Sequence, residues 1–494
     1  MKAIAGLRSI TRRIMNSAEF VLQAERPRKV ARMLEWARRE GAVWEKVNCF
    51  TFPPGYEGVQ ATQPLSPSET ILCLPHSLLL SSHHPALQPL QPLFSAHPAL
   101  FAQHQHSWWE DFRLVLFLIQ QQSLGLQSHY EPYLSALPLQ VDSTVAWPQA
   151  DLDLLQDPTL VNESNDRLSR LIVYWTQLKQ ALDQFPSLIS PEYFTLDRFI
   201  WAQFIVSSRT FGRSVPYTTL CPLAELVNHA PCHTYYIYGP RDSLKHTTIE
   251  AHDQDDWPED LYAPSYSQLI TIVKTHKGPF SKENANYLSS SAWEKDMCKQ
   301  QKDTQMHRTR SPVLQPCEDH FLRLVCGPNE SYKAGDEVCL NYGNRSNRAW
   351  LLYYGFALAN DPYKYELVQV NIRDYLPAEQ VKTALESGGP EIWTYKVRGN
   401  EVCEELLATF RAFHWSPSHP LSSALDSTYA SLEATARTAV IALLQRQLSS
   451  YATSPSEDEA LLLTRISLRM RFAVLYRLQR KLALAEQIAL LKAT

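Results

Sequence analysis

The strand-like segments of this chain lie far apart in the sequence, and this separation constrains the fold more than any other feature. Residues 69–75 form an apolar run closed by a proline, and further short strand-like runs occur within residues 212–240 and 319–343. A mainly helical stretch, residues 83–207, separates the first two, and a polar, irregular insertion at about 241–318 separates the last two. We therefore predict an α+β fold in which a small β-rich core is split by a helical insert.

Side-chain periodicity supports this prediction. Val338 and Leu340 alternate with more polar neighbours, the pattern of a strand with one buried face. Within the helical stretch, apolar residues at helical spacing form one face: Trp108, Phe112, Val115, Leu116 and Ile119. Upstream, the spacing of Met33 and Ala37 predicts a short helix that ends at Gly41.

The last third of the chain, residues 376–494, is predicted to form an all-helical lobe. Two apolar stripes support this: Val402, Leu406, Phe410 and Phe413, then Leu425, Tyr429, Leu432, Ala436, Val440 and Leu443. Ser454, Pro455 and Glu457 have the spacing of a capping box with proline at the first helical position, which predicts the start of one final helix. The expected domains are a basic lead-in, residues 1–29, a core domain, residues 30–375, and this lobe.

The composition excludes several classes of function. The 494-residue chain has a net charge of −4, so it lacks the basic field that a nucleic-acid partner requires. Its best apolar run, residues 114–119, is far shorter than the roughly 20 residues of a membrane-spanning helix. The nine cysteines contain no CxxC pair, and His97, His104 and His106 have no carboxylate or cysteine partner at ligand spacing. No metal site, nucleic acid or membrane partner is predicted, and no oligomer is implied.

The N-terminal region is basic. Residues 1–33 have only two acidic side chains, those of Glu19 and Glu25. The basic side chains are those of Lys2, Arg8, Arg12, Arg13, Arg26, Arg28, Lys29 and Arg32. Such a segment is typical either of a lead-in helix or of an organelle transit segment. Scattered cysteines are typical of a reducing compartment. We expect a cytoplasmic or nuclear protein, with organelle targeting as the alternative.

Two short blocks carry the residues of a candidate site. The first has the sequence SRTF at residues 208–211 and CPLAELVNH at 221–229, and the second has AGDEVCLNYG at 334–343 and YYGF at 353–356. In this order and spacing the blocks resemble the SET domain, in the class of the RuBisCO large-subunit methyltransferase. The similarity covers most of residues 30–490 outside the insertion. It implies a core with a knot-like crossing of the chain, a helical insert and a C-terminal lobe that binds a protein substrate.

The resemblance also implies a reaction and its residues. The reaction is transfer of a methyl group from S-adenosylmethionine to a lysine of a protein substrate, and Tyr342 is the catalytic tyrosine. Asn228 and His229 contact the adenine, and Arg209 reaches the cofactor carboxylate, which a guanidinium binds with two hydrogen bonds. The cofactor-side residues implied are Gly58, Arg209, Asn228, His229, Tyr342 and Phe356. The substrate-side residues implied are Arg209, Phe211, Arg213, Glu225 and Tyr354.

The sequence departs from the pattern of the family at three places. Glu225 stands where the family has an aspartate, which lengthens the acid by one methylene. The glycine-rich cofactor loop is reduced to Gly58, with Gly55 displaced by one position, and the missing side chain at Gly58 is expected to let the backbone approach the cofactor. The insertion after His229 stands where the family has a short hairpin near the substrate groove.

Methyl transfer from a sulfonium to an amine needs an uncharged amine held in line with the methyl group. Free lysine has a pKa near 10.4, so a dry aromatic channel favours the neutral amine. Aromatic rings also stabilise the sulfonium and the ammonium by roughly 0.5–2 kcal/mol. The rings available are those of Tyr342, Tyr354, Phe356 and Phe211. Two alternatives stay open: a histidine acceptor, and a SET-like scaffold that binds a protein partner without catalysis.

Overall fold

A computed structural model describes most of the chain. The described residues are 19–52, 56–101, 111–212, 215–241, 317–343, 345–359, 368–372, 394–397, 399, 402–414 and 427–493. Several of the residues discussed above lie outside them: 1–18, Gly55, His104, His106, Trp108, Arg213, 242–316 and Leu425. In the described part, no helix has both the length and the apolar character that crossing a bilayer requires.

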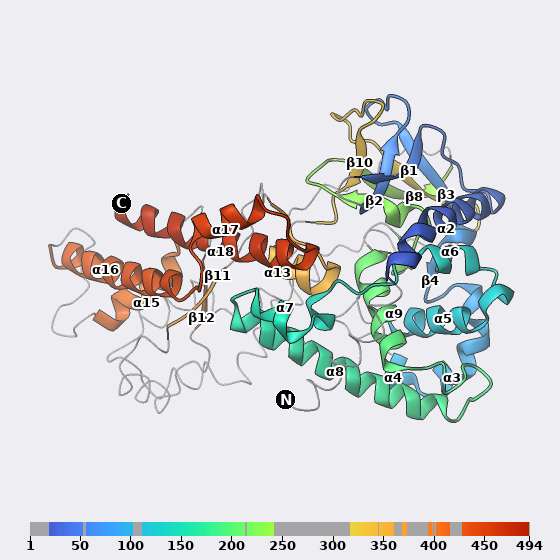
Figure 1. Cartoon of the computed structure of the whole chain (residues 1–494), viewed down its shortest axis with the longest axis horizontal. Helices are drawn as coiled ribbons and strands as arrows, with labels where there is room; N and C mark the ends of the chain where they lie inside the picture. Colours follow the sequence, from blue (N-terminus) through green and yellow to red (C-terminus); the bar gives the residue numbers. More distant parts are fainter. Residues whose placement is uncertain are drawn as a thin grey trace.

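The β-rich core is assembled from short strands that are distant in the sequence (Figure 1). One sheet has the order β1 (Val47–Phe52), β2 (Tyr56–Ala61), β10 (Glu337–Leu340), β7 (Asn228–His229). A second has the order β3 (Thr70–Pro75), β9 (His320–Val325), β8 (Tyr235–Pro240), and a third β4 (Leu80–Ser81), β6 (Thr219–Leu220), β5 (Thr210–Phe211). The predicted strand at residues 69–75 and the strand-like runs near 212–240 and 319–343 are confirmed.

Strand β10 holds the central position in its sheet. Val338 and Leu340 are buried and Cys339 is half-buried, so the predicted alternation is confirmed. The strand pairs antiparallel with β2, with Val338 opposite Val59, and parallel with β7, with Leu340 opposite His229. The two sequence blocks and the Gly58 segment therefore meet at one sheet.

Helix α2 (Glu19–Arg39) covers one side of this core. Met33, Trp36 and Ala37 are buried, as their spacing predicts. The helix is longer than the short helix that was predicted, and it ends just before Gly41, whose φ of +95° only glycine adopts readily.

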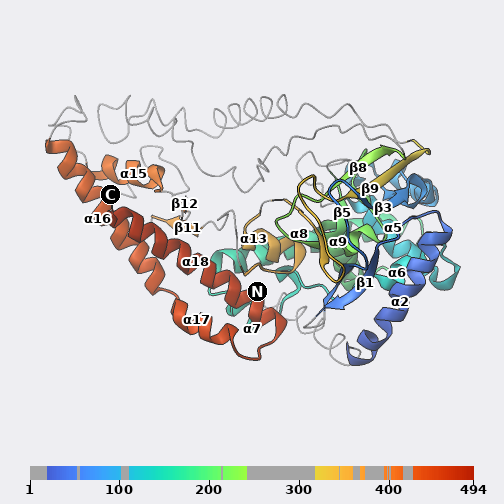
Figure 2. The same ribbon diagram turned by 90° about the horizontal axis from the view of Figure 1, so that it is seen from above.

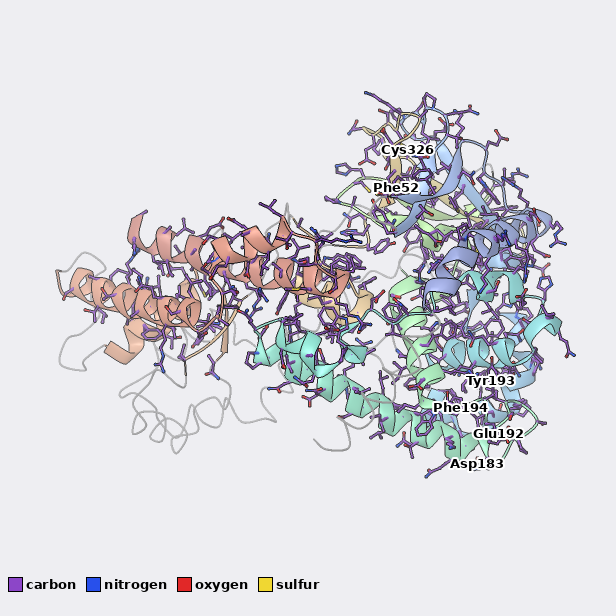
Figure 3. All side chains as sticks on the ribbon, viewed as in Figure 1. Phe52, Asp183, Glu192, Tyr193, Phe194 and Cys326 are labelled. Carbon is purple, nitrogen blue, oxygen red and sulfur yellow. The ribbon has the colours of Figure 1, made fainter. Side chains whose placement is uncertain are left out.

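The stretch predicted as a helical insert is helical. Its helices are α3 (Gln91–Ala96), α4 (Pro98–Phe101), α5 (Phe112–Ser123), α6 (Glu131–Ala136), α7 (Gln149–Asp153), α8 (Pro158–Leu182) and α9 (Leu196–Arg209). The Asp157 side chain caps α8 at Thr159 N, with Pro158 at the first helical position. Helices α5 and α9 pack against each other, and Phe112, Val115 and Ile119 are buried as predicted. Tyr193 and Phe194 lie at the end of this insert farthest from Phe52 (Figure 3).

The C-terminal lobe extends away from the core (Figure 2). Its helices are α15 (Glu404–His414), α16 (Ser427–Ser449), α17 (Pro455–Leu462) and α18 (Leu468–Ala493). The predicted lobe, residues 376–494, is not all-helical, because it contains β12 (Thr394–Val397). This strand pairs antiparallel with β11 (Val368–Asn371), which precedes the predicted boundary. Val368, Val370 and Val397 are buried in the same hydrophobic cluster as the lobe helices. Short strands next to long helices are hard to recognise in sequence, because their burial depends on tertiary packing.

The final helix is also different from the prediction. The Ser454 capping box is confirmed, but it begins α17, which ends at Leu462, and a separate helix α18 follows. Helix α18 joins the two halves of the molecule. Its Leu475 and Tyr476 belong to the hydrophobic cluster of the core, whereas Leu484 and Leu491 belong to that of the lobe.

Candidate active site

The candidate site is built where β2, β7 and β10 lie side by side. The Asn228 amide donates hydrogen bonds from Nδ2 to Glu57 O at 2.7 Å and to Glu337 Oε1 at 2.8 Å. A Cβ atom on Gly58 would lie 2.7 Å from the same Nδ2 and 3.0 Å from the Phe52 ring. Glycine was predicted here for close approach of a cofactor. In the structure the requirement comes from the chain itself, because the Asn228 and Glu337 side chains occupy that space. Phe52 marks this corner of the core in Figure 3.

His229 is linked directly to Tyr342. The Tyr342 backbone N–H donates to His229 Nδ1 at 3.1 Å. Burial lowers the pKa of His229 to about 4, so the imidazole is neutral at pH 7. Because Nδ1 accepts a hydrogen bond, it cannot also donate to Leu340 O, 3.3 Å away, and the proton resides on Nε2. His229 therefore keeps an N–H donor at Nε2.

The hydroxyl of Tyr342 is held by the chain that precedes Asn228. It donates to Val227 O at 2.5 Å. Burial raises the pKa of Tyr342 above its usual value, and the Tyr354 hydroxyl adds to the effect while Arg209 opposes it. The phenol therefore stays protonated at physiological pH. It can donate a hydrogen bond and orient a reacting group, but it is not a base.

Aromatic rings surround this pair. The His229 ring centroid lies 5.3 Å from that of Tyr342 and 4.5 Å from that of Trp350. Trp350 stacks on Phe356 at 5.0 Å, and Tyr354 lies 5.8 Å from Tyr342. The structure thus brings Tyr342, Tyr354 and Phe356 together, as predicted. Such rings stabilise a nearby cation through their quadrupoles.

Trp350 is a member of this cluster that was not predicted. It is buried and belongs to a π-helical turn, Trp350–Tyr354, a form of helix often found at functional sites. The turn places the Trp350 and Tyr354 rings edge to face at 4.9 Å. The only sequence signal for it was the four-residue spacing of these two aromatic residues.

Gly355 ends the π-helical turn in the left-handed region, with φ of +81°. A Cβ atom at this position would lie 2.7 Å from the backbone carbon of Asp142. Both the positive φ and the close approach require glycine. The turn thereby directs Tyr354 and Phe356 toward the same cluster, which explains the sequence YGF in physical terms.

Arg209 and Glu225 form the charged side of the site. Arg209 Nη1 donates to Glu225 O at 3.3 Å and lies 3.8 Å from Glu225 Oε1. Arg209 Nε is buried and has no hydrogen-bond partner among the described residues. The second oxygen of Glu225, Oε2, accepts a hydrogen bond from the Tyr133 hydroxyl at 2.8 Å. Tyr133 was not predicted, and no sequence signal links it to Glu225 across 92 positions.

Of the remaining predicted residues, the structure describes Phe211. The Phe211 ring packs edge to face against Tyr236 at 4.9 Å, rather than joining the rings around His229. Arg213 lies outside the described residues. A search of the described residues for groups of histidine, cysteine and acidic side chains able to hold a metal ion found none.

Comparisons with known proteins point to one fold. No family model matches the chain. The chain is 29% identical over 216 residues to the chloroplastic [fructose-bisphosphate aldolase]-lysine N-methyltransferase of Arabidopsis thaliana, covering 42% of this chain and 41% of that protein. It is 23% identical over 234 residues to the actin-histidine N-methyltransferase of Xenopus tropicalis, covering 46% and 39%. The chain thus spans less than half the length of either relative.

The structural match is more extensive. The crystal structure of the SET domain of LSMT bound to lysine and AdoHcy aligns with a TM-score of 0.57 at 19% identity, over 94% of this chain and 91% of that one. This chain has the SET-domain fold. The resemblance inferred from the two sequence blocks is therefore confirmed. In this fold the residues near positions 58, 228 and 342 lie close together.

Proposed function

We propose that this SET domain transfers a methyl group from S-adenosylmethionine to the side-chain amine of a lysine in a protein substrate. The observation that carries the proposal is the junction of Asn228, His229 and Tyr342 beside the aromatic cluster, with Arg209 within electrostatic range of Tyr342. The lysine methyltransferase among the relatives and the ligands of the matching crystal structure support the same reaction.

The residues present fit S-adenosylmethionine. The Arg209 side chain is partly exposed, and a guanidinium suits the carboxylate of the cofactor. His229 offers an Nε2–H donor, and the rings of Tyr342, Trp350 and Phe356 suit a sulfonium. When bound, S-adenosylmethionine supplies the electrophilic methyl group. Gly58, Asn228 and Phe356 are proposed to complete its site.

The chain's own residues are proposed to prepare the amine. Tyr342 and Tyr354 form a largely apolar wall that disfavours an ammonium and so favours the nucleophilic amine. The protonated Tyr342 hydroxyl orients the reacting groups without removing a proton. Glu225, Phe211 and Arg213 are proposed to contact the substrate around this opening. Alignment of the partners is expected to provide several kcal/mol of the barrier reduction.

The arrangement of the rest of the chain leads to further proposals. The parallel pairing of β7 with β10 supports the knot-like crossing of the chain near Asn228. The lobe from β11 to α18 is proposed to bind the protein substrate, because it has its own core and projects from the SET domain. The described cysteines are free thiols, which supports a cytoplasmic or nuclear site of action. The chloroplastic relative keeps organelle targeting as the alternative.

The test is methyl transfer to proteins of a cell lysate. The full chain is incubated with S-adenosylmethionine that carries a labelled methyl group, and labelled residues are identified by mass spectrometry. We expect label on lysine, and at least about tenfold less label with Tyr342→Phe, a loss of roughly 1.4 kcal/mol of transition-state stabilisation. Label on histidine would show that histidine, rather than lysine, accepts the methyl group. Cofactor binding without any labelling would favour the scaffold alternative.

A further inference from the structure

Tyr133 is a completely buried tyrosine whose hydroxyl points at the acid of the site. It lies on α6, its relative exposure is 0%, and its hydroxyl donates to Glu225 Oε2 at 2.8 Å. Its ring stacks on Trp36 of α2 at 6.5 Å with an interplanar angle of 16°, and α6 packs against α2. Two packed helices therefore fix the position of this hydroxyl.

Glu225 lies in a 3-10 turn, Ala224–Leu226, and its side chain is 2% exposed. Burial raises the pKa of this carboxyl, and Arg209, the Tyr133 hydroxyl and the more distant Arg26 act against that rise. Two further titratable groups, Cys221 and Tyr342, feel the charge of Glu225. A carboxylate buried this deeply depends on its donors, because an unsatisfied buried charge is costly.

Arg209 in turn takes its orientation from Glu225. One terminal nitrogen, Nη1, donates a hydrogen bond to the Glu225 carbonyl oxygen at 3.3 Å and forms a longer ion pair, at 3.8 Å, with the Glu225 carboxylate. While Nη1 binds Glu225, the buried Nε has no hydrogen-bond partner among the described residues. Movement of the carboxylate would disturb this ion pair, which sets the orientation of the guanidinium together with the backbone hydrogen bond.

We propose that Tyr133 is a positioning residue for the amino-acid end of the cofactor, because it fixes Glu225, and Glu225 fixes Arg209. The inference rests on the proposed function, since it assigns Arg209 to the carboxylate of S-adenosylmethionine. It also explains why position 225 has a glutamate and not the shorter aspartate. An aspartate at this position would withdraw the carboxylate by about 1.5 Å, the length of one carbon–carbon bond, and break the 2.8 Å contact with Tyr133.

The test compares two ligands that differ in the group that Arg209 would bind. S-adenosylhomocysteine has the amino-acid carboxylate, whereas 5′-methylthioadenosine has the same nucleoside without it. Affinities of both are measured by calorimetric titration of the full chain and of Tyr133→Phe. We expect Tyr133→Phe to bind S-adenosylhomocysteine about tenfold more weakly, as for loss of a hydrogen bond to a charged group, and to bind 5′-methylthioadenosine unchanged. A general loss of packing would weaken both ligands equally.

Tyr130→Phe is the matched control. Tyr130 directly precedes α6, is buried and packs its ring against Trp36 and Phe117. The Tyr130→Phe variant should bind both ligands with the affinities of the unaltered protein. Glu225→Gln is a second variant, in case Tyr133→Phe does not fold, and it should show the same selective loss because it removes the charge that holds Arg209.

The outcomes separate the two proposals. If the unaltered protein binds S-adenosylhomocysteine and the Tyr133→Phe and Glu225→Gln variants bind it equally well, the role of Tyr133 is wrong and the proposed function stands. Equal weakening of both ligands would also overturn the role of Tyr133. An unaltered protein that binds neither ligand would overturn the inference together with the proposed function.

Discussion

Two groups of buried charged residues, one at the junction of core and lobe and one in the candidate site, are built differently. At the junction of core and lobe, the Asp458 carboxylate is fully hydrogen-bonded. It accepts from Arg477 Nη2 at 2.7 Å, from Lys481 Nζ at 2.6 Å and from the Thr453 hydroxyl at 2.9 Å. In the candidate site, the closest approach of Arg209 to the Glu225 carboxylate is 3.8 Å, and Arg209 Nε has no partner among the described residues. The first group is satisfied by the chain itself.

The difference indicates what each group does. Asp458 and Lys481 are completely buried, and hydrogen bonds from Arg477 and Lys481 outweigh burial to hold the pKa of Asp458 below its usual value. Nearby, the Tyr476 hydroxyl on α18 donates to Asp157, which caps α8, so the junction ties the lobe to the insert. At Arg209, by contrast, the nearest carboxylate lies beyond hydrogen-bond distance, which leaves part of the guanidinium able to bind a ligand.

The largest effect is expected at the junction. Asp458→Ala leaves Arg477 and Lys481 buried without their acid, and breaking such a pair costs about 3–5 kcal/mol. The free energy of unfolding, measured in urea, should fall by that amount. Glu459→Ala, an exposed acid on the same helix, is the control and should have little effect. Equal losses in the two variants would show that the junction is not the structural group we describe.

The next effect concerns the guanidinium of the site. Arg209→Lys keeps a positive charge beside Glu225 but cannot bind a carboxylate with two parallel hydrogen bonds. We expect the affinity for S-adenosylhomocysteine to fall about thirtyfold, roughly 2 kcal/mol, with little change in unfolding free energy. A lower unfolding free energy with unchanged affinity for S-adenosylhomocysteine would show that Arg209 has a structural role and does not bind the ligand.

Acid should lower the free energy of unfolding, because His229 is buried in its neutral form. The unfolded chain protonates this histidine below its ordinary pKa of 6.5, whereas the folded chain does so only below about 4. The unfolded state therefore gains protons first as the pH falls, and stability decreases between pH 6.5 and 4. Between pH 7 and 5 we expect the native protein to lose about 1–2 kcal/mol more unfolding free energy than His229→Asn.

The smallest effect is expected at the start of α17. Ser454→Ala removes the hydroxyl that accepts from Glu457 N, a loss of about 1 kcal/mol in unfolding free energy. The cap lies on the surface next to Asp458, so methyl transfer should be unaffected. A change in activity without a change in stability would mean that the lobe acts on the site through this turn.

Much of this arrangement could be predicted from the sequence, and the reasons for the exceptions are physical. The alternation of Val338 and Leu340, and the blocks around Asn228 and Tyr342, depend on local patterns. The contact of Tyr133 with Glu225 does not, because it joins α6 to a turn 92 residues away. The strands β11 and β12 are stabilised by burial against the lobe helices, and such packing leaves little trace in the local sequence.

The central claim is that the parts of the chain around Arg209, Asn228 and Tyr342 form one site for S-adenosylmethionine. Calorimetric titration of the full chain with S-adenosylmethionine tests it most directly. The account predicts saturable binding of one molecule per chain, weakened by Arg209→Lys and unaffected by Glu459→Ala. A well-folded protein that shows no binding at millimolar S-adenosylmethionine would contradict it.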